Sequence, residues 1–388
     1  MGSPASGRAP RPFHVTFVTF VTFALATPAI AAGVEVVPYG AIRSGVPVRQ
    51  AILTNDRRMT VKVIGYGATV TDIVVPDAKG RGANVALGFG SLADYEAKNG
   101  DYAFGATVGR YSGRIANARF SLDGREVRLV PNDGPNALHG GPGAWFGKLF
   151  SVAPFRHGRE VGAVLRYSSA DGEQGFPGKL DLRVTYTLQP DNALRIDYEA
   201  RSDAPTVINL TNHSYFNLAG AGSGSALGHR LRIDSAKLLE TDAGGIPTGR
   251  FLPVAETPFD FRRARPIGER MARPHPQMEG RRGFNHSWLL PFDGRLHHAA
   301  TLTDPNSGRR LDVLTTEPSL VLYTGNWFSG RDKGAQGTVY RPYDGVALET
   351  QHLPDSPNRR DFPSTALRPG KVFRSTTIYR FSTAKARR

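Results

Sequence analysis

Leu180–Leu188 (LDLRVTYTL) and Ala193–Tyr198 (ALRIDY) are the segments that decide the fold. In both of them apolar or β-branched residues alternate with polar ones, which is the period of a strand with one buried face. The residues between them include Pro190, Asp191 and Asn192, which are types that favour turns. The two segments therefore predict a β-hairpin.

Short runs of the same kind recur on both sides of this hairpin, and turn-forming residues separate them. The clearest are Met59–Ile64, Ala68–Val75, Ala163–Tyr167, Val207–Leu210 and Ser375–Phe381. Helical periodicity is rare, and the best example is Ser91–Lys98, with Ser91 as the expected N-cap. The pattern predicts an all-β fold, a sandwich or a barrel, with few short helices.

The composition narrows the classes of function. The chain of 388 residues contains no cysteine, which excludes a disulfide scaffold, a thiolate zinc site and a cysteine nucleophile. Lys and Arg number 49 against 34 Asp and Glu, giving a net charge of +15. The excess is mostly arginine scattered along the chain, without a long basic block interleaved with aromatic residues. We therefore expect a basic surface and no nucleic-acid partner.

The N-terminus has the order of features found in secretory signals. Arg8 and Arg11 precede the apolar run Val15–Ala26, and the small residues of Ala29–Ala31 follow it. The apolar run is too short to span a membrane, which takes about 20 apolar residues. These features predict a signal peptide over 1–31, a single mature domain over 32–388 without stable membrane insertion, and a secreted or periplasmic location. The alternative is an unprocessed membrane-proximal tail.

Phosphate-binding and zinc-protease motifs are absent from the sequence. Glu349 and His352 are three residues apart, a spacing that forms a metal pair on a helix. The run Gly345–Glu349 reads as a strand, however, and positions three apart on a strand face opposite sides. The sequence thus predicts no metal and no cofactor.

Four polar segments with glycines, histidines and arginines stand out: Gly109–Ile115, Gly134–Gly141, Asn209–Asn217 and Leu348–Asn358. They resemble the signature segments of the aldose 1-epimerases, the galactose mutarotase family. Asp171–Gly178 and Thr324–Asn326 add to the resemblance, which extends over Val48–Phe381.

This resemblance implies a large antiparallel β-sandwich of the galactose mutarotase type, with a sugar cleft across one sheet. It also implies interconversion of the α and β anomers of free aldoses, with Glu349 as the catalytic base and His213 as the acid. The chemistry suits these residues, because a carboxylate is ionised at neutral pH and an imidazole can hold or release a proton there. No metal, cofactor or nucleophile is needed.

The resemblance further implies that Arg114 and His139 contact sugar hydroxyls and that Tyr215 lines the site. Two positions depart from the common pattern. Gly113 stands where the family often has Asn, and Asn285 stands where the family has an acidic sugar ligand. An amide still accepts and donates hydrogen bonds, but it loses the strength that a charge adds.

Glu317 lies in a segment of the pattern T-T-[QE]-P and is expected to be a further acidic group that binds the sugar. A buried sugar also favours an aromatic face. Phe176, Trp145 and Trp327 are the candidates, and the sequence does not separate them.

Other functions remain open at the level of sequence. A sugar-binding β-sandwich without turnover would lack the acid or the base. A glycoside hydrolase needs two facing carboxylates, which would make Glu317 the partner of Glu349. An epimerase of phosphorylated hexoses would need extra arginines in the cleft. The preferred aldose (galactose, glucose, xylose or arabinose) and the oligomeric state are not indicated.

Overall fold

The hairpin predicted from the sequence is present in the computed structural model, which describes residues 1–5, 7, 9 and 31–383. Strands β13 (Leu180–Leu188) and β14 (Ala193–Ser202) pair antiparallel, with Leu188 opposite Leu194. The predicted signal peptide lies largely outside the described residues.

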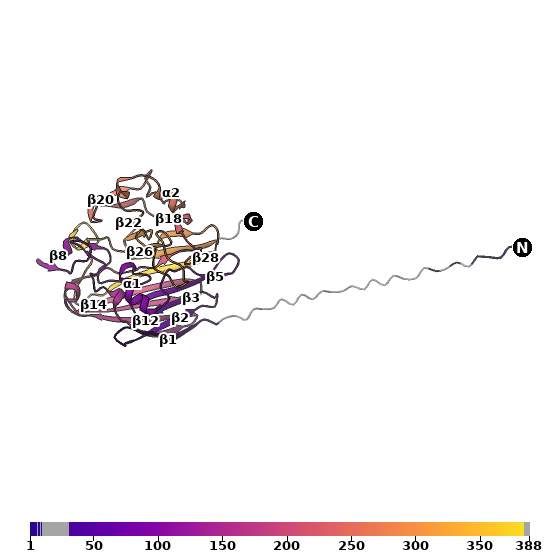
Figure 1. The fold of residues 1–388 in the computed structure, drawn as a ribbon, viewed down its shortest axis with the longest axis horizontal. Coiled ribbons are helices and arrows are strands. Elements are labelled where there is room, and N and C mark those ends of the chain that lie inside the picture. The colour runs from indigo at the N-terminus through magenta and orange to yellow at the C-terminus, as the bar shows by residue number, and fades with distance from the viewer. Residues whose placement is uncertain (6, 8, 10–30, 384–388) are drawn as a thin grey trace.

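Strands are the main regular secondary structure of the described chain, as predicted, and they form three larger antiparallel sheets (Figure 1). In sheet order, the five-stranded sheet contains β1 (Gly33–Ala41), β2 (Pro47–Thr54), β3 (Thr60–Ile64), β4 (Thr69–Pro76) and β5 (Gly82–Asn84). The nine-stranded sheet contains β11 (Ser151–His157), β12 (Glu160–Ser169), β13, β14, β28 (Phe373–Thr383), β24 (Arg309–Thr315), β23 (His297–Thr303), β18 (Arg230–Ile233) and β21 (Arg265–Pro266). The six-stranded sheet contains β17 (Tyr215–Phe216), β26 (Val346–Gln351), β25 (Ser319–Tyr323), β22 (Asn285–Leu289), β19 (Lys237–Thr241) and β20 (Pro247–Pro253).

Short two-stranded ladders connect these sheets. They are β6 (Thr107–Val108) with β16 (Thr211–Asn212), β7 (Arg114–Ile115) with β10 (Ala137–Leu138), β8 (Arg119–Leu122) with β9 (Arg125–Arg128), and β15 (Thr206–Val207) with β27 (Ala366–Leu367). The expected strand over Val207–Leu210 is thus reduced to the end of β15. Residues 208–210 are not part of a continuous strand. Asn209 forms an isolated β-bridge with Tyr111.

Helices are few in the described chain. Helix α1 (Leu92–Tyr102) begins after Ser91, whose hydroxyl accepts a hydrogen bond from the Asp94 N–H at 3.2 Å, as the sequence predicted. Helix α2 (Ile267–Met271) is a little over one turn long. No helix within the described residues is long and apolar enough to cross a membrane.

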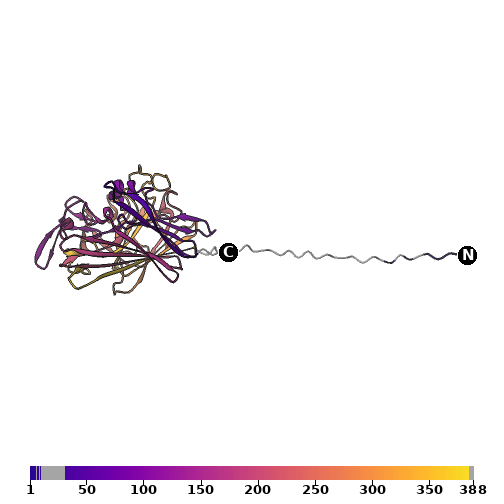
Figure 2. The same ribbon diagram turned by 90° about the horizontal axis from the view of Figure 1, so that it is seen from below.

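The sheets pack in layers, which Figure 2 shows from the side. Strands β1 and β2 contact β11 and β12, so the five-stranded sheet lies against one end of the nine-stranded sheet. A continuous apolar core joins all three sheets through residues such as Val61, Val184 and Leu348. Alternation along each strand supplies one face to this core and leaves the other face free for polar chemistry.

Candidate active site

A cleft of about 370 Å³ opens over the free face of the six-stranded sheet. Most of the cleft-lining residues from this sheet lie on three strands: Asn285 and Ser287 on β22, Val321 and Tyr323 on β25, and Glu349 and Gln351 on β26. The ends of β17 and β19 add Tyr215 and Thr241. Loops and short strands contribute the rest, among them Gly113, Arg114, His139, His213, Tyr215 and Arg281.

The register of the sheet places Glu349 in this cleft. Glu349 on β26 lies directly opposite Val321 on β25, and Val321 lies opposite Ser287 on β22. The adjacent residues Leu348 and Leu322 are opposite each other on the other face, where both are buried in the core. The alternation of β26 therefore aims one carboxylate at the cleft between neighbours that anchor the strand.

Glu349 and His213 form a pair within the cleft. The Glu349 Oε1 and His213 Nε2 atoms are 3.5 Å apart, and the two residues are only 3% and 4% exposed. Burial raises the pKa of the Glu349 carboxyl, and the nearby His213 acts in the opposite direction. A carboxylate with a raised pKa is a stronger proton acceptor, which suits a general base.

His213 is held by its backbone and its ring is left free. It lies between β16 and β17, where its N–H donates to the Ala106 carbonyl at 2.9 Å and its carbonyl accepts from the Gly105 N–H at 3.0 Å. Its Nδ1 atom has no hydrogen-bond partner among the described residues. The backbone therefore fixes the position of the side chain, and the Nε2 atom faces the Glu349 carboxylate.

His139 has a defined tautomer. The Gly113 N–H donates to His139 Nδ1 at 3.2 Å, so Nδ1 is an acceptor and Nε2 carries the proton of the neutral ring. Burial lowers the pKa of His139 well below its usual value, and repulsion from His213 and Arg114 adds to the effect. His139 is therefore a neutral hydrogen-bond donor at neutral pH. Gly113 contributes through its backbone, in a left-handed conformation with φ of +79°.

Two arginines line the cleft. The Arg114 Nε donates to Asp133 Oδ2 at 2.7 Å, an ion pair that fixes the guanidinium. Arg281, in the loop before β22, donates through Nη2 to the Thr241 hydroxyl at 2.8 Å and to the Asp242 carbonyl at 2.6 Å. Nothing in the sequence singled out Arg281, because it is one of 49 basic residues.

The ligand atoms of His139, His213 and Glu349 lie within 4.8 Å of one another, a spacing that could hold a metal ion. The sequence predicted no metal, because Glu349 and His352 were expected to face opposite sides of a strand and no third ligand was apparent. His139 and His213 come from loops and short strands distant in sequence, so no spacing rule relates them to Glu349.

Several aromatic rings surround the pair. The Tyr215 ring is 4.9 Å from the His213 ring between centroids, and Tyr323 lies 5.8 Å from Tyr215. Trp327 lines the cleft and is 56% exposed. Phe176 and Trp145, the other two candidates for stacking on a sugar, are buried outside the cleft.

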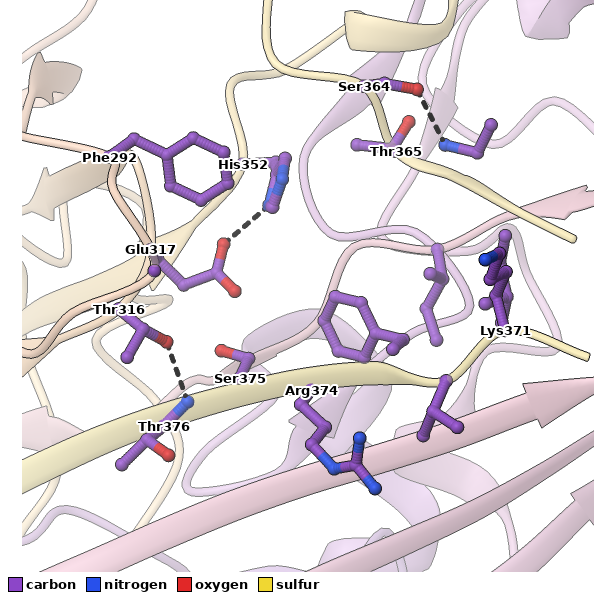
Figure 3. A pocket seen from close by; sticks show the side chains of 16 residues that line it. Phe292, Thr316, Glu317, His352, Ser364, Thr365, Lys371, Arg374, Ser375 and Thr376 are labelled. Atoms are coloured by element: carbon purple, nitrogen blue, oxygen red, sulfur yellow. Dashed lines mark hydrogen bonds and ion pairs between the residues drawn. The ribbon is translucent and has the colours of Figure 1, made fainter.

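The structure does not bring Glu317 to the cleft, which corrects the expectation that it binds the sugar. Glu317 is 2% exposed and its Oε2 atom is 2.6 Å from His352 Nδ1. Figure 3 shows the two side chains pointing toward each other beside Phe292, in a separate cavity of about 470 Å³. Glu317 precedes β25 in a turn, and the cleft-facing positions of that strand are Val321 and Tyr323.

Gln351 was also missed, although a signal for it exists. It lies two residues after Glu349 on β26 and thus shares its face. Its Oε1 accepts a hydrogen bond from the Ser112 hydroxyl, which ties the strand to the loop that carries Gly113. Val321 had no such signal, because apolar residues in strands normally face a core.

Comparisons with known proteins agree on one family. The sequence model of the aldose 1-epimerase family matches residues 49–380. The galactose mutarotase of Sus scrofa is 39% identical over 352 residues, which cover 89% of this chain and 98% of that protein. The aldose 1-epimerase of Escherichia coli (strain K12) is 38% identical over 342 residues, covering 87% and 96%.

Solved structures match the fold over the same range. The galactose 1-epimerase of Lactobacillus acidophilus NCFM is 29% identical with a TM-score of 0.80, and the match covers 91% of this chain and all of that chain. An aldose epimerase homologue from C. elegans is 27% identical with a TM-score of 0.76, again over 91% of this chain and all of the other. The chain belongs to the aldose 1-epimerase family.

Proposed function

We propose that this isomerase interconverts the α and β anomers of free aldoses, with Glu349 as the base and His213 as the acid. The observation that carries the proposal is the buried pair itself, a carboxylate oxygen and an imidazole nitrogen 3.5 Å apart in an open cleft. The anomeric hydroxyl and the ring oxygen of an aldose are bonded to the same carbon. A base and an acid this close together can therefore reach both of them.

The reaction moves one proton at each residue. Glu349 takes the proton of the anomeric hydroxyl, the C1–O1 bond becomes a carbonyl, and the bond from C1 to the ring oxygen breaks. His213, which begins the step as the imidazolium, donates the Nε2 proton to the departing ring oxygen and becomes the neutral imidazole. The aldehyde rotates about the C1–C2 bond, and both protons return as the ring closes on the other face.

The remaining groups hold the sugar during this rotation. His139 offers its Nε2–H as a donor to a hydroxyl, because Gly113 occupies the other ring nitrogen. Arg114 offers the guanidinium nitrogens that Asp133 leaves free. Asn285 accepts from one hydroxyl and donates to another. Interactions that keep the open-chain sugar bound prevent its release before the ring closes.

A glycoside hydrolase fits these residues less well, since it needs a second carboxylate facing Glu349. Glu317 is hydrogen-bonded to His352 in another cavity, and Asp133 is paired with Arg114. A binding protein without turnover also fits less well, because it has no need of an acid and a base placed together.

Polarimetry tests the function directly. Freshly dissolved α-D-galactose and α-D-glucose lose rotation slowly in buffer, and we expect the protein to accelerate this decay for at least one of them. The ratio of the two rates sets the sugar preference. No acceleration with either sugar, with binding still detected by calorimetry, would favour the sugar-binding alternative.

We also propose that the chain is exported, with a signal peptide over 1–31 and a mature domain over 32–388. The support is the order of Arg8 and Arg11, the apolar run Val15–Ala26 and the small residues at Ala29–Ala31. N-terminal sequencing of protein from a bacterial periplasm or medium tests this, with Ala32 expected as the first residue. An intact Met1 start in the exported fraction would contradict it.

A further inference from the structure

The two guanidinium groups of the cleft differ in their counter-charges. Arg114 has an acidic partner, Asp133, at 2.7 Å. Arg281 has no carboxylate within 4.0 Å among the described residues, and the acceptors it contacts are a hydroxyl and a backbone carbonyl. Among the described residues, the cleft thus contains one arginine in a direct ion pair and one without.

The unpaired cation is held in place and is partly withdrawn from water. Arg281 is half-buried, and both of its hydrogen bonds use Nη2. The donors on Nε and Nη1 contact no acceptor of the described residues. Burial and repulsion from Arg114 lower the pKa of Arg281, and Asp242 acts in the opposite direction without coming within 4.0 Å of the guanidinium. The free Nε–H and Nη1–H do not share an edge of the guanidinium, so each offers one separate hydrogen bond to an anionic group.

Asp242 offsets the charge of Arg281 only in part, and the nearby groups that line the cleft add no direct counter-ion. Asn285, four residues after Arg281, presents a neutral amide to the cleft. The other carboxylates that line the cleft are Asp133, committed to Arg114, Asp101, exposed at the end of α1, and the base Glu349. A negatively charged group on the substrate would therefore pair with Arg281.

We propose that the cleft is built for an aldose that carries a carboxylate, a uronic acid, and that Arg281 binds this carboxylate. The inference rests on the proposed function and names the substrate class of the same site. A fixed guanidinium with unoccupied N–H donors matches a carboxylate of one negative charge, which it can bind through a charge-assisted hydrogen bond. A phosphate carries a charge between −1.5 and −2 at neutral pH and calls for more than one free cation, whereas Arg114 is already neutralised.

The test compares the catalytic efficiency for charged and neutral aldoses. Mutarotation of D-galacturonate, D-galactose and D-glucose 6-phosphate is measured at low and high NaCl concentration, by polarimetry or by exchange between the anomeric NMR signals. We expect kcat/KM for galacturonate to equal or exceed that for galactose at low salt. High salt should reduce this ratio, because it screens the ion pair.

Arg281→Gln should lower the galacturonate-to-galactose ratio of kcat/KM at least tenfold, mainly through KM for the uronate. The matched control is Arg262→Gln, which removes the same charge from an exposed arginine paired with Asp260 outside the cleft. The control should leave the ratio unchanged. Arg281→Lys should restore part of the ratio, since it keeps the charge and loses the fixed donors of the planar guanidinium.

The outcomes separate the two proposals. Turnover of galactose with a galacturonate ratio below one tenth would overturn the uronate assignment and leave the epimerase function standing. A ratio that Arg281→Gln does not change, or a preference for glucose 6-phosphate over galacturonate, would also overturn it. No acceleration with any of the three sugars would contradict the proposed function itself.

Discussion

The molecule contains two buried pairs of glutamate and histidine, and they differ in almost every respect except composition. In the cleft, Glu349 and His213 are 3.5 Å apart, and no acceptor within the described residues meets His213 Nδ1. In the second cavity, Glu317 and His352 are 2.6 Å apart in a close hydrogen bond. Glu349 and His213 are thus farther apart than a close hydrogen bond, whereas Glu317 and His352 are hydrogen-bonded to each other.

The difference lies in what holds the side chains. Glu349 belongs to the middle of β26, and His213 is fixed through its backbone by Gly105 and Ala106. Neither side chain needs the other to stay in place, so both remain free to exchange protons with a substrate. Glu317 and His352 lie outside regular strands, in a turn before β25 and just after β26, and they satisfy each other. The first pair is arranged for chemistry and the second for stability.

The largest expected effect separates the pairs by activity. Glu349→Gln keeps the shape of the side chain and removes the base, so we expect kcat to fall by about 10²–10⁴-fold, the usual contribution of general acid–base catalysis. Glu317→Gln should stay within threefold of wild type. Polarimetry on both variants measures this. Similar losses of kcat in the two variants would show that the two glutamate–histidine pairs do not differ in their role in catalysis.

The pH dependence sharpens the same contrast. The base must be ionised, and burial raises the pKa of Glu349 above its ordinary value of about 4.5. We therefore expect kcat/KM to fall about tenfold per pH unit below that raised pKa, at a pH where an exposed glutamate would still be ionised. In a pH–rate profile, a falling limb centred at or below pH 4.5 would contradict this expectation.

Stability should change in opposite directions at the two sites. Glu317→Leu removes the partner of the buried His352 and should lower the free energy of unfolding by about 2 kcal/mol. Glu349→Gln should raise stability at pH 7. The folded wild-type protein binds the Glu349 proton more tightly than the unfolded chain does. The protonated carboxyl therefore contributes its full stabilisation below the unfolded pKa, and this stabilisation is lost as the pH rises through the folded pKa.

Urea unfolding of the wild type and both variants at pH 4 and pH 7 measures these changes. The gain from Glu349→Gln should disappear at pH 4, where the wild-type side chain is also protonated. A loss of stability in Glu349→Gln at pH 7 would indicate that the catalytic pair is itself a stabilising contact.

The smallest effect concerns the loop that supports the catalytic pair. Gly113→Ala adds a Cβ at a φ of +79°, where its contacts with Gln351 and Pro354 are 3.4–3.5 Å and thus ordinary. We expect a loss of about 1 kcal/mol from backbone strain alone, with kcat within a few-fold of wild type. Thermal unfolding and polarimetry measure the two quantities. A loss of activity as large as that of Glu349→Gln would mean that the backbone at 113 takes part in the chemistry.

The sequence predicted some residues of this site and missed others. The alternation in Leu180–Leu188 predicted the hairpin, since a strand with one buried face requires that pattern. Glu349 and His213 were identified through segments that resemble the family, and the structure brings them together. Glu317 was misplaced because its cavity depends on where β25 begins, and a sequence does not reveal register. Arg281 was missed because an unpaired charge becomes visible only when its surroundings are known.

The alternation along β26 has a consequence for how folding can be followed. A shift of one residue against β25 would turn Leu348 and Thr350 toward the cleft and bury Glu349 in the core. A misregistered sheet would have nearly the same circular dichroism as the native one and would have no base in the cleft. The recovery of turnover during refolding therefore measures how fast β26 reaches its native register. A spectroscopic signal of strand content does not measure this.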